Sequence, residues 1–373
     1  MVLACGKGDF VGDATDRRAI VRIAVLGATI LAAAPVTAFQ INPLKNRYHG
    51  DRPPGGFWEN ISETVHEDIT DAARRCLGDG RVAPPGPVAV PITCPIETTV
   101  PIRPSTGNKY DPLIRGVWWN DDPNQHLFGV HYATWVLWMR DAKGIATKGR
   151  NWLGGRTLIG PGYKMQYRGH YGDLQFLHAM ANADGDAAKD VQARTIEWIE
   201  FAYAVATEQV GPDTLLGDLR LPAARNFTRQ SGWSVHYLFA PKFTLGQASI
   251  KEVALGSILH VVQDSYSRAH ADRSYGPSAR CPNGRIVEFH AYGHQDSDRH
   301  NVADTRASWQ GNSDYRPDNS PVQASAQILR FARERADWET VVKPYLLERL
   351  FCIDDDARAS SPGDIGMNQN RHT

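Results

Sequence analysis

Residues 255–273, LGSILHVVQDSYSRAHADR, constrain the fold of this chain more than any other segment. They place His260, Asp264 and His270 in the pattern His-x3-Asp-x5-His, inside a run that is otherwise typical of a buried helix. On a helix that turns about 100° per residue, Asp264 would lie roughly 40° to one side of His260, and His270 roughly 80° to the other. Burying three such groups without partners is costly. The segment therefore predicts a core helix that carries metal ligands, with Asp264 placed to bridge two ions.

The residue types in this pattern indicate zinc chemistry. A single histidine in a core helix would more commonly be a hydrogen-bonded structural residue, so the prediction depends on the triplet. Imidazole and carboxylate ligands without thiolate suit catalytic zinc, which keeps a position open for water. Zinc lowers the pKa of bound water to about 7, and zinc ions that share a carboxylate can also hold the oxygens of a phosphodiester. No G-x-S-x-G, P-loop or dinucleotide fingerprint competes with phosphoric ester hydrolysis.

Residues 1–38 have the features of a leader and signal peptide. Three arginines precede an apolar run over residues 23–34. Val36 and Ala38 occupy the positions where signal peptidase prefers small residues, which predicts a mature chain that begins at Phe39 and is secreted or periplasmic. An uncleaved membrane anchor is the alternative, but the run is shorter than the roughly 20 residues of a membrane span.

Four cysteines follow the leader, namely Cys76, Cys94, Cys281 and Cys352. An even number in an exported chain favours two disulfides, for which three connectivities are possible. Proximity in the sequence favours Cys76 with Cys94 and Cys281 with Cys352. No CxxC or paired Cys/His spacing occurs, which argues against a thiolate zinc site.

Periodicity predicts an all-α protein. Apolar residues recur at helical spacing, and alternating β-branched runs are few. Helices are expected over residues 57–77, 186–210, 249–275 and 322–350. The last of them should be kinked or broken at Pro344. We expect a compact multi-helix domain with long loops over residues 39–352, and a disordered tail over residues 353–373.

The central pattern resembles a known motif. His260-x3-Asp264-x5-His270 is similar to the central motif of the superfamily that joins zinc-dependent phospholipase C with the secreted single-strand-specific zinc nucleases. Its members are mainly helical and bind a cluster of three zinc ions, two of which the central Asp bridges. The resemblance is carried by short motifs over residues 39 to about 310, separated by insertions over residues 78–106 and 143–162.

The resemblance implies ligands before the central motif. His170-Tyr171-Gly172-Asp173 resembles the family's pattern of His, aromatic residue and Asp, which favours His170 and leaves His178 as the fallback. The partner Asp of the family often follows a Trp by two positions, as Asp121 does, with Asp122 as the rival.

After the central motif, His300 and Asp304 resemble the His-x3-Asp pair of the nucleases. His290 and His294 are the fallback, since the lipase branch has its pair closer to the central motif.

For the third ion the family uses the terminal amine and carbonyl of the mature chain, usually on Trp, together with a His of the first helix. Here these would be Phe39 and His66, with His49 as the alternative histidine. Backbone atoms bind the ion, so Phe can replace Trp.

The resemblance implies a complete set of ligands for two or three zinc ions. One zinc would be held by Asp121, His170, His260 and Asp264; a second by His270, His300 and Asp304; a third by Asp264, His66 and the Phe39 terminus. We expect Asp121 and Asp264 to be the catalytic carboxylates.

The expected function is an exported zinc-dependent phosphodiester hydrolase that uses a zinc-bound hydroxide. The substrate is a phospholipid, with transient contact to a membrane surface, or a single-stranded nucleic acid. The chain has 41 basic and 41 acidic side chains and no basic tract, which favours phospholipase C slightly. For the nuclease alternative, Trp118, Tyr132 and Trp135 are candidates for stacking on bases. A non-catalytic exported metal-binding protein is the rival from another class, and the sequence indicates no protein partner.

Overall fold

The computed structural model describes residues 63–78, 92–94, 111–126, 132–151, 153, 155, 158–241, 249–281 and 283–366. Within these ranges the protein is mainly helical, as expected, but it is not all-α, because it contains one two-stranded sheet. No helix in the described ranges is long and apolar enough to cross a membrane. The predicted leader, the terminus at Phe39 and the alternative ligand His49 lie outside the described residues.

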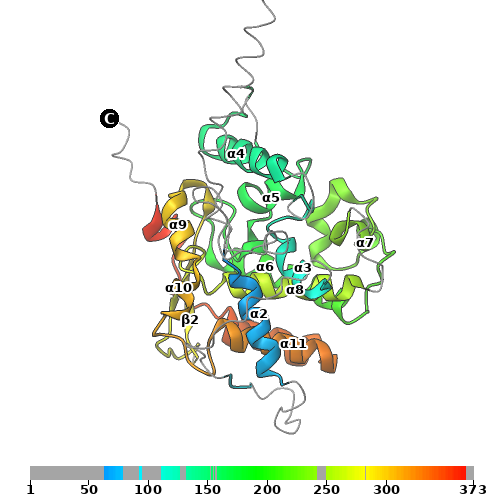
Figure 1. Cartoon of the computed structure of the whole chain (residues 1–373). Coiled ribbons are helices and arrows are strands. Elements are labelled where there is room, and N and C mark those ends of the chain that lie inside the picture. The colour runs from blue at the N-terminus through cyan, green and yellow to red at the C-terminus, as the bar shows by residue number, and fades with distance from the viewer. Residues whose placement is uncertain are drawn as a thin grey trace, which may run out of the picture.

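Figure 1 shows how the helices and the small sheet are arranged. The α-helices are α2 (Val65–Cys76), α3 (Pro112–Trp119), α4 (Tyr132–Lys148), α5 (Met165–Tyr171), α6 (Ala188–Ala206), α7 (Val235–Phe239), α8 (Ile250–Asp264), α9 (Ser297–Ala303), α10 (Arg306–Gln310), α11 (Pro321–Glu334) and α12 (Lys343–Tyr345). Shorter or wider turns are η3 (Gln175–His178), η4 (Leu216–Asp218), η5 (Pro222–Gln230), η7 (Tyr292–His294), η8 (Trp338–Val342), η9 (Leu346–Leu350) and η10 (Gly363–Ile365). The sheet consists of β1 (Ala271–Ser274) and β2 (Arg285–Phe289), which are antiparallel.

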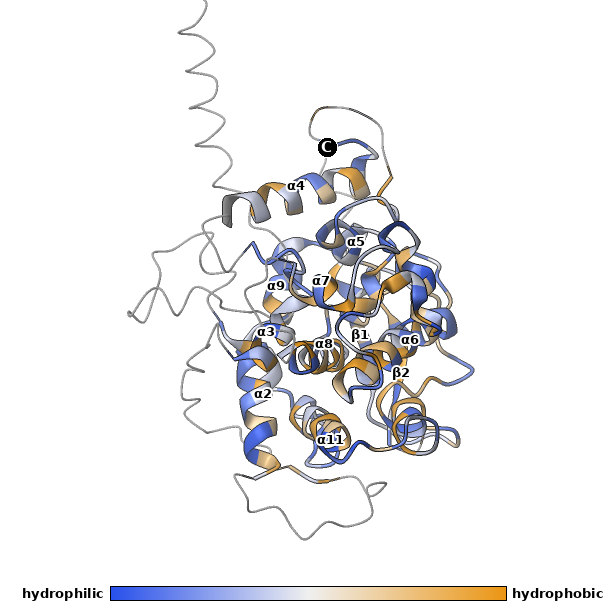
Figure 2. Ribbon diagram, turned by 90° about the vertical axis from the view of Figure 1, so that its right-hand side faces the viewer, coloured by the Kyte–Doolittle hydropathy of each residue, from blue (hydrophilic) through white to orange (hydrophobic). Residues whose placement is uncertain are grey.

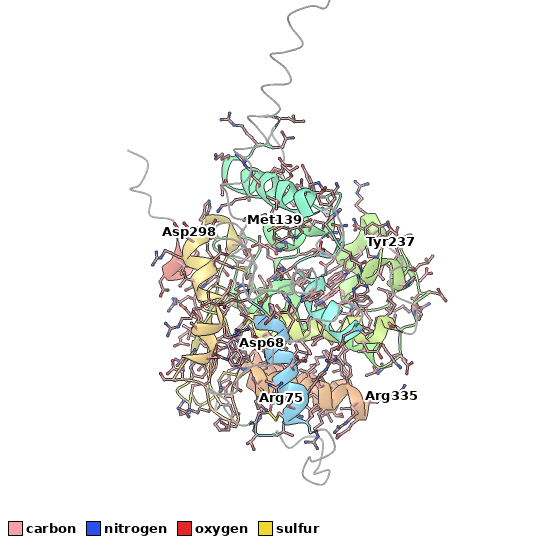
Figure 3. All side chains as sticks on the ribbon, viewed as in Figure 1. Asp68, Arg75, Met139, Tyr237, Asp298 and Arg335 are labelled. Carbon is pink, nitrogen blue, oxygen red and sulfur yellow. A yellow bond between two sulfur atoms is a disulfide. The ribbon has the colours of Figure 1, made fainter. Side chains whose placement is uncertain are left out.

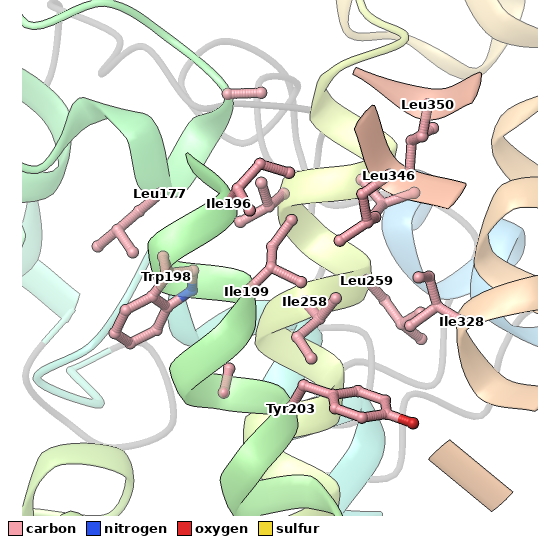
Figure 4. Packing of buried hydrophobic residues seen from close by; sticks show 14 of the residues in the cluster. Leu177, Ile196, Trp198, Ile199, Tyr203, Ile258, Leu259, Ile328, Leu346 and Leu350 are labelled. Atoms are coloured by element: carbon pink, nitrogen blue, oxygen red, sulfur yellow. The ribbon is translucent and has the colours of Figure 1, made fainter. Parts of the chain in front are cut away.

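Helix α8 lies in the middle of the molecule, and α2, α3, α6 and α11 pack around it (Figure 2). It is buried along most of its length because apolar residues cover most of its circumference. Ile258 and Leu259 of α8 meet Ile199 of α6 and Ile328 of α11 in the main core (Figure 4). Polar residues in the same helix, His260 and Asp264 among them, are therefore also enclosed.

Two glycines let α3 and α8 pack backbone against backbone. A Cβ atom on Gly116 would lie 2.2 Å from the carbonyl oxygen of Val253, and one on Gly256 would lie 2.2 Å from that of Leu113. No side chain fits in either place. The contact brings the end of α3, and with it Asp121, next to His260 of α8.

The expectation that the central helix continues to residue 275 was wrong. Helix α8 ends at Asp264, and Ser265 to His270 form turns that lead into β1. Arg273 stabilises this end, because its guanidinium donates hydrogen bonds to the carbonyl oxygen (2.6 Å) and hydroxyl (2.8 Å) of Ser265. His270 therefore lies beyond the helix, and the angular argument that placed it on the helical arc does not apply.

The break in the expected helix over residues 322–350 also lies elsewhere. Helix α11 ends at Glu334, because Arg335 adopts a left-handed conformation with φ 49°. Asp337 then caps the next helix by accepting a hydrogen bond from the Thr340 backbone N–H. Pro344 lies within that helix, where wide turns on either side accommodate its missing N–H.

Both expected disulfides are confirmed. Cys76 pairs with Cys94 and Cys281 with Cys352, with Cα–Cα distances of 5.5 Å and 5.8 Å. Two disulfides indicate an oxidising, extracellular environment.

The segment after Cys352 is not the disordered tail that we expected, at least as far as residue 366. Ile353 is 2% and Ser360 4% exposed. Backbone bridges join Ile353 to Ile286, Ser361 to His290, and Gly366 to Gln295. We call residues 352–366 the C-terminal strap; residues 367–373 lie outside the described residues.

Candidate metal centre

Nine histidine and aspartate side chains meet in three buried groups. The first group is Asp121, His170 and His178; the central group is His66, His260 and Asp264; the third group is His270, His300 and Asp304. Within each group, one possible ligand atom from each residue lies within 4.8 Å of the others, and all nine side chains are at most 1% exposed. Each group could hold a metal ion.

Asp264 connects the three groups. Its Oδ2 lies 2.9 Å from His178 Nδ1 of the first group and 3.0 Å from His260 Nε2 of its own group. Its Oδ1 lies 3.2 Å from His66 Nε2. The same Oδ2 lies 3.5 Å from His270 Nδ1 of the third group. A carboxylate with histidines on both oxygens has the position that a bridging ligand requires.

The first group forms where the end of α3 meets α5 and η3. Asp121 lies two residues beyond the end of α3, and the Trp135 indole N–H donates to its backbone oxygen at 3.2 Å. Its carboxylate lies 3.6 Å from His170 Nε2. His178, at the end of η3, completes the group.

The third group forms around α9. His300 and Asp304 are one helical turn apart, and His300 Nε2 lies 2.9 Å from Asp304 Oδ2. His270 approaches the same oxygen at 3.8 Å from the turn after α8. The Ser267 hydroxyl donates a hydrogen bond to the other oxygen of Asp304.

Five of the six histidines are oriented alike, since the Nδ1 atom of each faces a carbonyl-type oxygen. The pairs are His66 with Gln263 Oε1 (2.6 Å), His170 with Gln166 O (2.9 Å), His260 with Val117 O (2.6 Å), His270 with His178 O (2.6 Å) and His300 with Gln295 Oε1 (2.6 Å). An oxygen acceptor requires the proton on Nδ1, so in the neutral imidazole the lone pair is on Nε2, which points into the centre. Metal-binding histidines are held in this way.

Several buried atoms of the centre have no hydrogen-bond partner among the described residues. They are both carboxylate oxygens of Asp121, Asp264 Oδ1, Asp304 Oδ2, and the Nε2 atoms of His170, His178, His270 and His300. Leaving one such atom unpaired costs about 1–3 kcal/mol. So many in one place fit a centre whose atoms bind metal, and nitrogen and oxygen donors without thiolate fit zinc.

The charges in the centre are strongly coupled. Burial raises the pKa of Asp264, but His260 and His270 lower it more, so that it lies well below its usual range. Burial lowers the pKa of His270, but Asp264 and Asp304 raise it to about 9. Burial instead lowers the pKa of His178 to about 4. His178 therefore offers a neutral imidazole at neutral pH, whereas metal would have to displace a proton from His270.

The structure groups the expected ligands differently from the assignment by resemblance. It brings His270, His300 and Asp304 together as that assignment did. It places His260 with His66 and Asp264, and His178 takes the position beside Asp121 and His170 that the assignment gave to His260.

Three of the candidates named as rivals or fallbacks lie outside the three groups. The Asp122 carboxylate accepts a hydrogen bond from the His126 backbone N–H at 2.8 Å. His290 is buried, with Nε2 3.4 Å from Asp272 Oδ1. His294 is exposed and pairs with Asp184 at 2.7 Å.

Two of the proposed stacking residues are not surface residues. Trp118 and Trp135 are fully buried, and the Trp118 indole N–H donates to Glu67 at 2.7 Å. Both lie in the core because they sit on the inner faces of α3 and α4. The side chain of Tyr132 lies outside the described residues.

Sequence reasoning missed the glutamines that hold the histidines. Gln263 accepts from His66 and donates to Thr70 (2.9 Å) and Ser325 (3.2 Å). The Gln295 side-chain oxygen likewise accepts from His300 Nδ1. Their only signal is proximity to ligands, since Gln263 directly precedes Asp264 and Gln295 stands five residues before His300.

No family model, curated protein or solved structure matches this chain. The interpretation of the centre therefore depends on its own geometry.

Proposed function

We propose that this protein is an exported zinc-dependent phosphoric ester hydrolase, secreted or periplasmic. The observation that supports it best is the convergence of three nitrogen and oxygen donor groups on one carboxylate, Asp264. The three groups would hold zinc ions, with Asp264 shared between neighbouring ones. Zinc in such a site polarises phosphate oxygens and lowers the pKa of bound water.

The protein's own side chains have distinct tasks in this proposal. Gln263 and Gln295 orient His66 and His300, so the ligands are in place before substrate arrives. Asp121 has no protein hydrogen bond to either carboxylate oxygen among the described residues. One oxygen can bind metal while the other accepts the proton of an attacking water, as expected of a general base.

A surface groove supports a single-stranded nucleic acid as the substrate. It has a volume of about 1010 Å³ and is lined mainly by residues between 158 and 165 and between 228 and 233, with Trp138 of α4 and Tyr237 of α7; Figure 3 labels Tyr237. Four of its lining residues are aromatic and two are cations: Trp138, Tyr163, Trp233, Tyr237, Lys164 and Arg229. None is a carboxylate. Aromatic rings with cations and without acids suit the bases and phosphates of a single strand.

A phospholipid is the second substrate that an observation favours. Leu153 and Leu158 are 77% and 84% exposed, and Leu158 lines the groove. Exposed leucines beside tryptophan, tyrosine and lysine are also typical of a surface that contacts lipid headgroups.

A non-catalytic metal centre is the rival function. Every ligand side chain is at most 1% exposed, and a structural site needs no route for substrate. The two functions differ in whether a bound metal can reach a phosphate ester.

Metal analysis and paired assays test the proposal. The mature protein should bind at least two zinc ions, and Asp264→Asn should lose zinc, whereas the control Asp298→Asn, on the surface of α9, should not. Zinc-loaded protein should cleave single-stranded DNA more than phosphatidylcholine vesicles, and EDTA should abolish cleavage reversibly. Fewer than two zinc ions, with Asp264→Asn unchanged, would refute the proposal. Zinc binding without cleavage of either substrate would favour the structural centre.

A further inference from the structure

The C-terminal strap lies beside the third group. Its start is fixed to the chain by the Cys281–Cys352 disulfide. Arg358 then forms ion pairs with Glu288 (2.6 Å) and Asp272 (2.7 Å) on the two strands of the sheet. Further on, the Ala291 N–H donates to Ser361 O at 2.8 Å, and the Asp296 N–H to Ile365 O at 2.8 Å. The strap therefore runs from the sheet to the start of α9.

Gln295 links the strap to a ligand. Its side chain is 2% exposed. Oε1 accepts from His300 Nδ1 at 2.6 Å, while Nε2 donates to Ala269 O (2.6 Å) and Pro362 O (3.1 Å). If the strap moved away from α9, the contact with Pro362 would be lost, and Ala269 alone would accept from the Gln295 amide nitrogen. The side-chain amide makes both links at once, because its oxygen accepts from His300 while its nitrogen donates to the strap.

A glycine holds the strap close to this region. Gly363 has φ +67°, and a Cβ atom there would lie 2.4 Å from Cε1 of the buried His290. Any side chain at this position would push the strap off the ring, and Pro362, which accepts from Gln295, is the preceding residue. The position of the strap against His290 thus requires glycine at residue 363.

We propose that the C-terminal strap is a positioning element for the third metal group, and that Gln295 transmits its placement to His300. The strap holds Gln295, Gln295 fixes the ring of His300, and the ring presents Nε2 to the ion. This inference rests on the proposed metal centre. Displacing the strap should therefore lower the affinity for one zinc ion, although no ligand is replaced.

Zinc affinity in the full-length protein tests the relay, measured by competition with a chromophoric chelator. Gln295→Leu and Gly363→Val should each lower the affinity for one zinc ion about 10–100-fold. This is the usual effect of losing the residue that holds a metal ligand in place. The double variant should bind zinc no more weakly than the weaker-binding single variant, because both changes interrupt the same chain of contacts. Gln295→Glu, which keeps the acceptor for His300 but loses both donors, should fall between Gln295→Leu and wild type.

Gly149→Val is the matched control. Gly149 also has a positive φ, +62°, but a Cβ atom there meets nothing within 4 Å. The substitution therefore strains the backbone without displacing the strap, and zinc affinity should stay at the wild-type value. Unchanged zinc affinity in Gln295→Leu or Gly363→Val, or losses that multiply in the double variant, would overturn the inference. Wild-type protein that binds zinc but hydrolyses no phosphate ester would refute the proposed function and leave the strap's role standing.

Discussion

Asp264 is the residue at which the three groups of the centre meet. Its two oxygens contact His66 on one side and His178 and His260 on the other. A carboxylate in this position must stay ionised, and its lowered pKa agrees with that. Replacing it should affect more than one ion, whereas replacing a histidine should affect one.

His178 separates the observed first group from the assignment by resemblance. His178→Ala should abolish the binding of one zinc ion or lower the affinity for it at least tenfold, because the substitution deletes one of three donors. His294→Ala is the control, since His294 is exposed and outside the three groups. Zinc titration of both variants measures the difference. Equal zinc content in His178→Ala and wild type would show that His178 is not a ligand.

At the scale of residues, contacts within one helix could be predicted from the spacing in the sequence, whereas contacts between distant segments could not. His300 and Asp304 stand four apart on one helix, so their contact follows from helical geometry. That His178 joins His170 in the first group depends on how η3 packs against α8, which no local pattern records. The roles of Gln263 and Gln295 depend on tertiary contacts in the same way.

At the scale of elements, α3 is the helix that places the first group. It begins after Asp111, whose carboxylate accepts from the backbone N–H groups of Leu113 (3.0 Å) and Ile114 (3.3 Å). The same carboxylate pairs with Arg74 of α2 through two hydrogen bonds, at 2.8 Å and 3.0 Å. One side chain therefore caps α3 and joins it to α2.

This arrangement gives a pH-dependent prediction. Burial raises the pKa of Asp111, but Arg74 lowers it more, so the folded value lies below the unfolded one. Such a carboxylate stabilises the fold above the unfolded pKa of about 3.9, and this contribution is lost as the pH falls through the folded value. Asp111→Asn, which keeps a capping oxygen, should lower the free energy of unfolding by about 0.5–1 kcal/mol at pH 7, since the pair is partly screened by solvent.

Urea denaturation of wild type and Asp111→Asn at pH 7 and at pH 3 measures this effect. The difference between the two proteins should shrink at the lower pH. A difference of the same size at both values would mean that the charge of Asp111 does not contribute.

Periodicity predicted the existence of the elements better than their ends. The long amphipathic run over residues 186–210 contains α6 because its apolar stripe faces the core. The end of α8 at Asp264 depends on Arg273, which reaches back from β1, and the break after α11 depends on a left-handed Arg335. Neither has a strong signal in the sequence, and Pro344, which has one, lies inside a helix.

At the scale of the whole molecule, the two disulfides close loops of different length. Cys76 and Cys94 are 18 residues apart and Cys281 and Cys352 are 71 apart. The longer loop contains β2, α9 and α11, and with them two ligands of the third group.

Replacing both cysteines of a pair with serine should lower the free energy of unfolding more for the pair that closes the longer loop. Chain entropy alone gives about 3 kcal/mol for Cys76–Cys94 and about 4 kcal/mol for Cys281–Cys352. Thermal unfolding of both double variants measures the order. Zinc content should fall only in the second, because that bond anchors the strap. The reverse order of stability would show that native-state contacts outweigh the loop entropy.

The ligands are also ordered along the chain. The first group is complete by His178, the central group by Asp264 and the third group by Asp304, while the strap that seats His300 comes last. A chain clipped beyond Asp304, at the start of the strap, would therefore keep all nine ligands and lose only the strap that positions His300, so only the third group should bind metal more weakly.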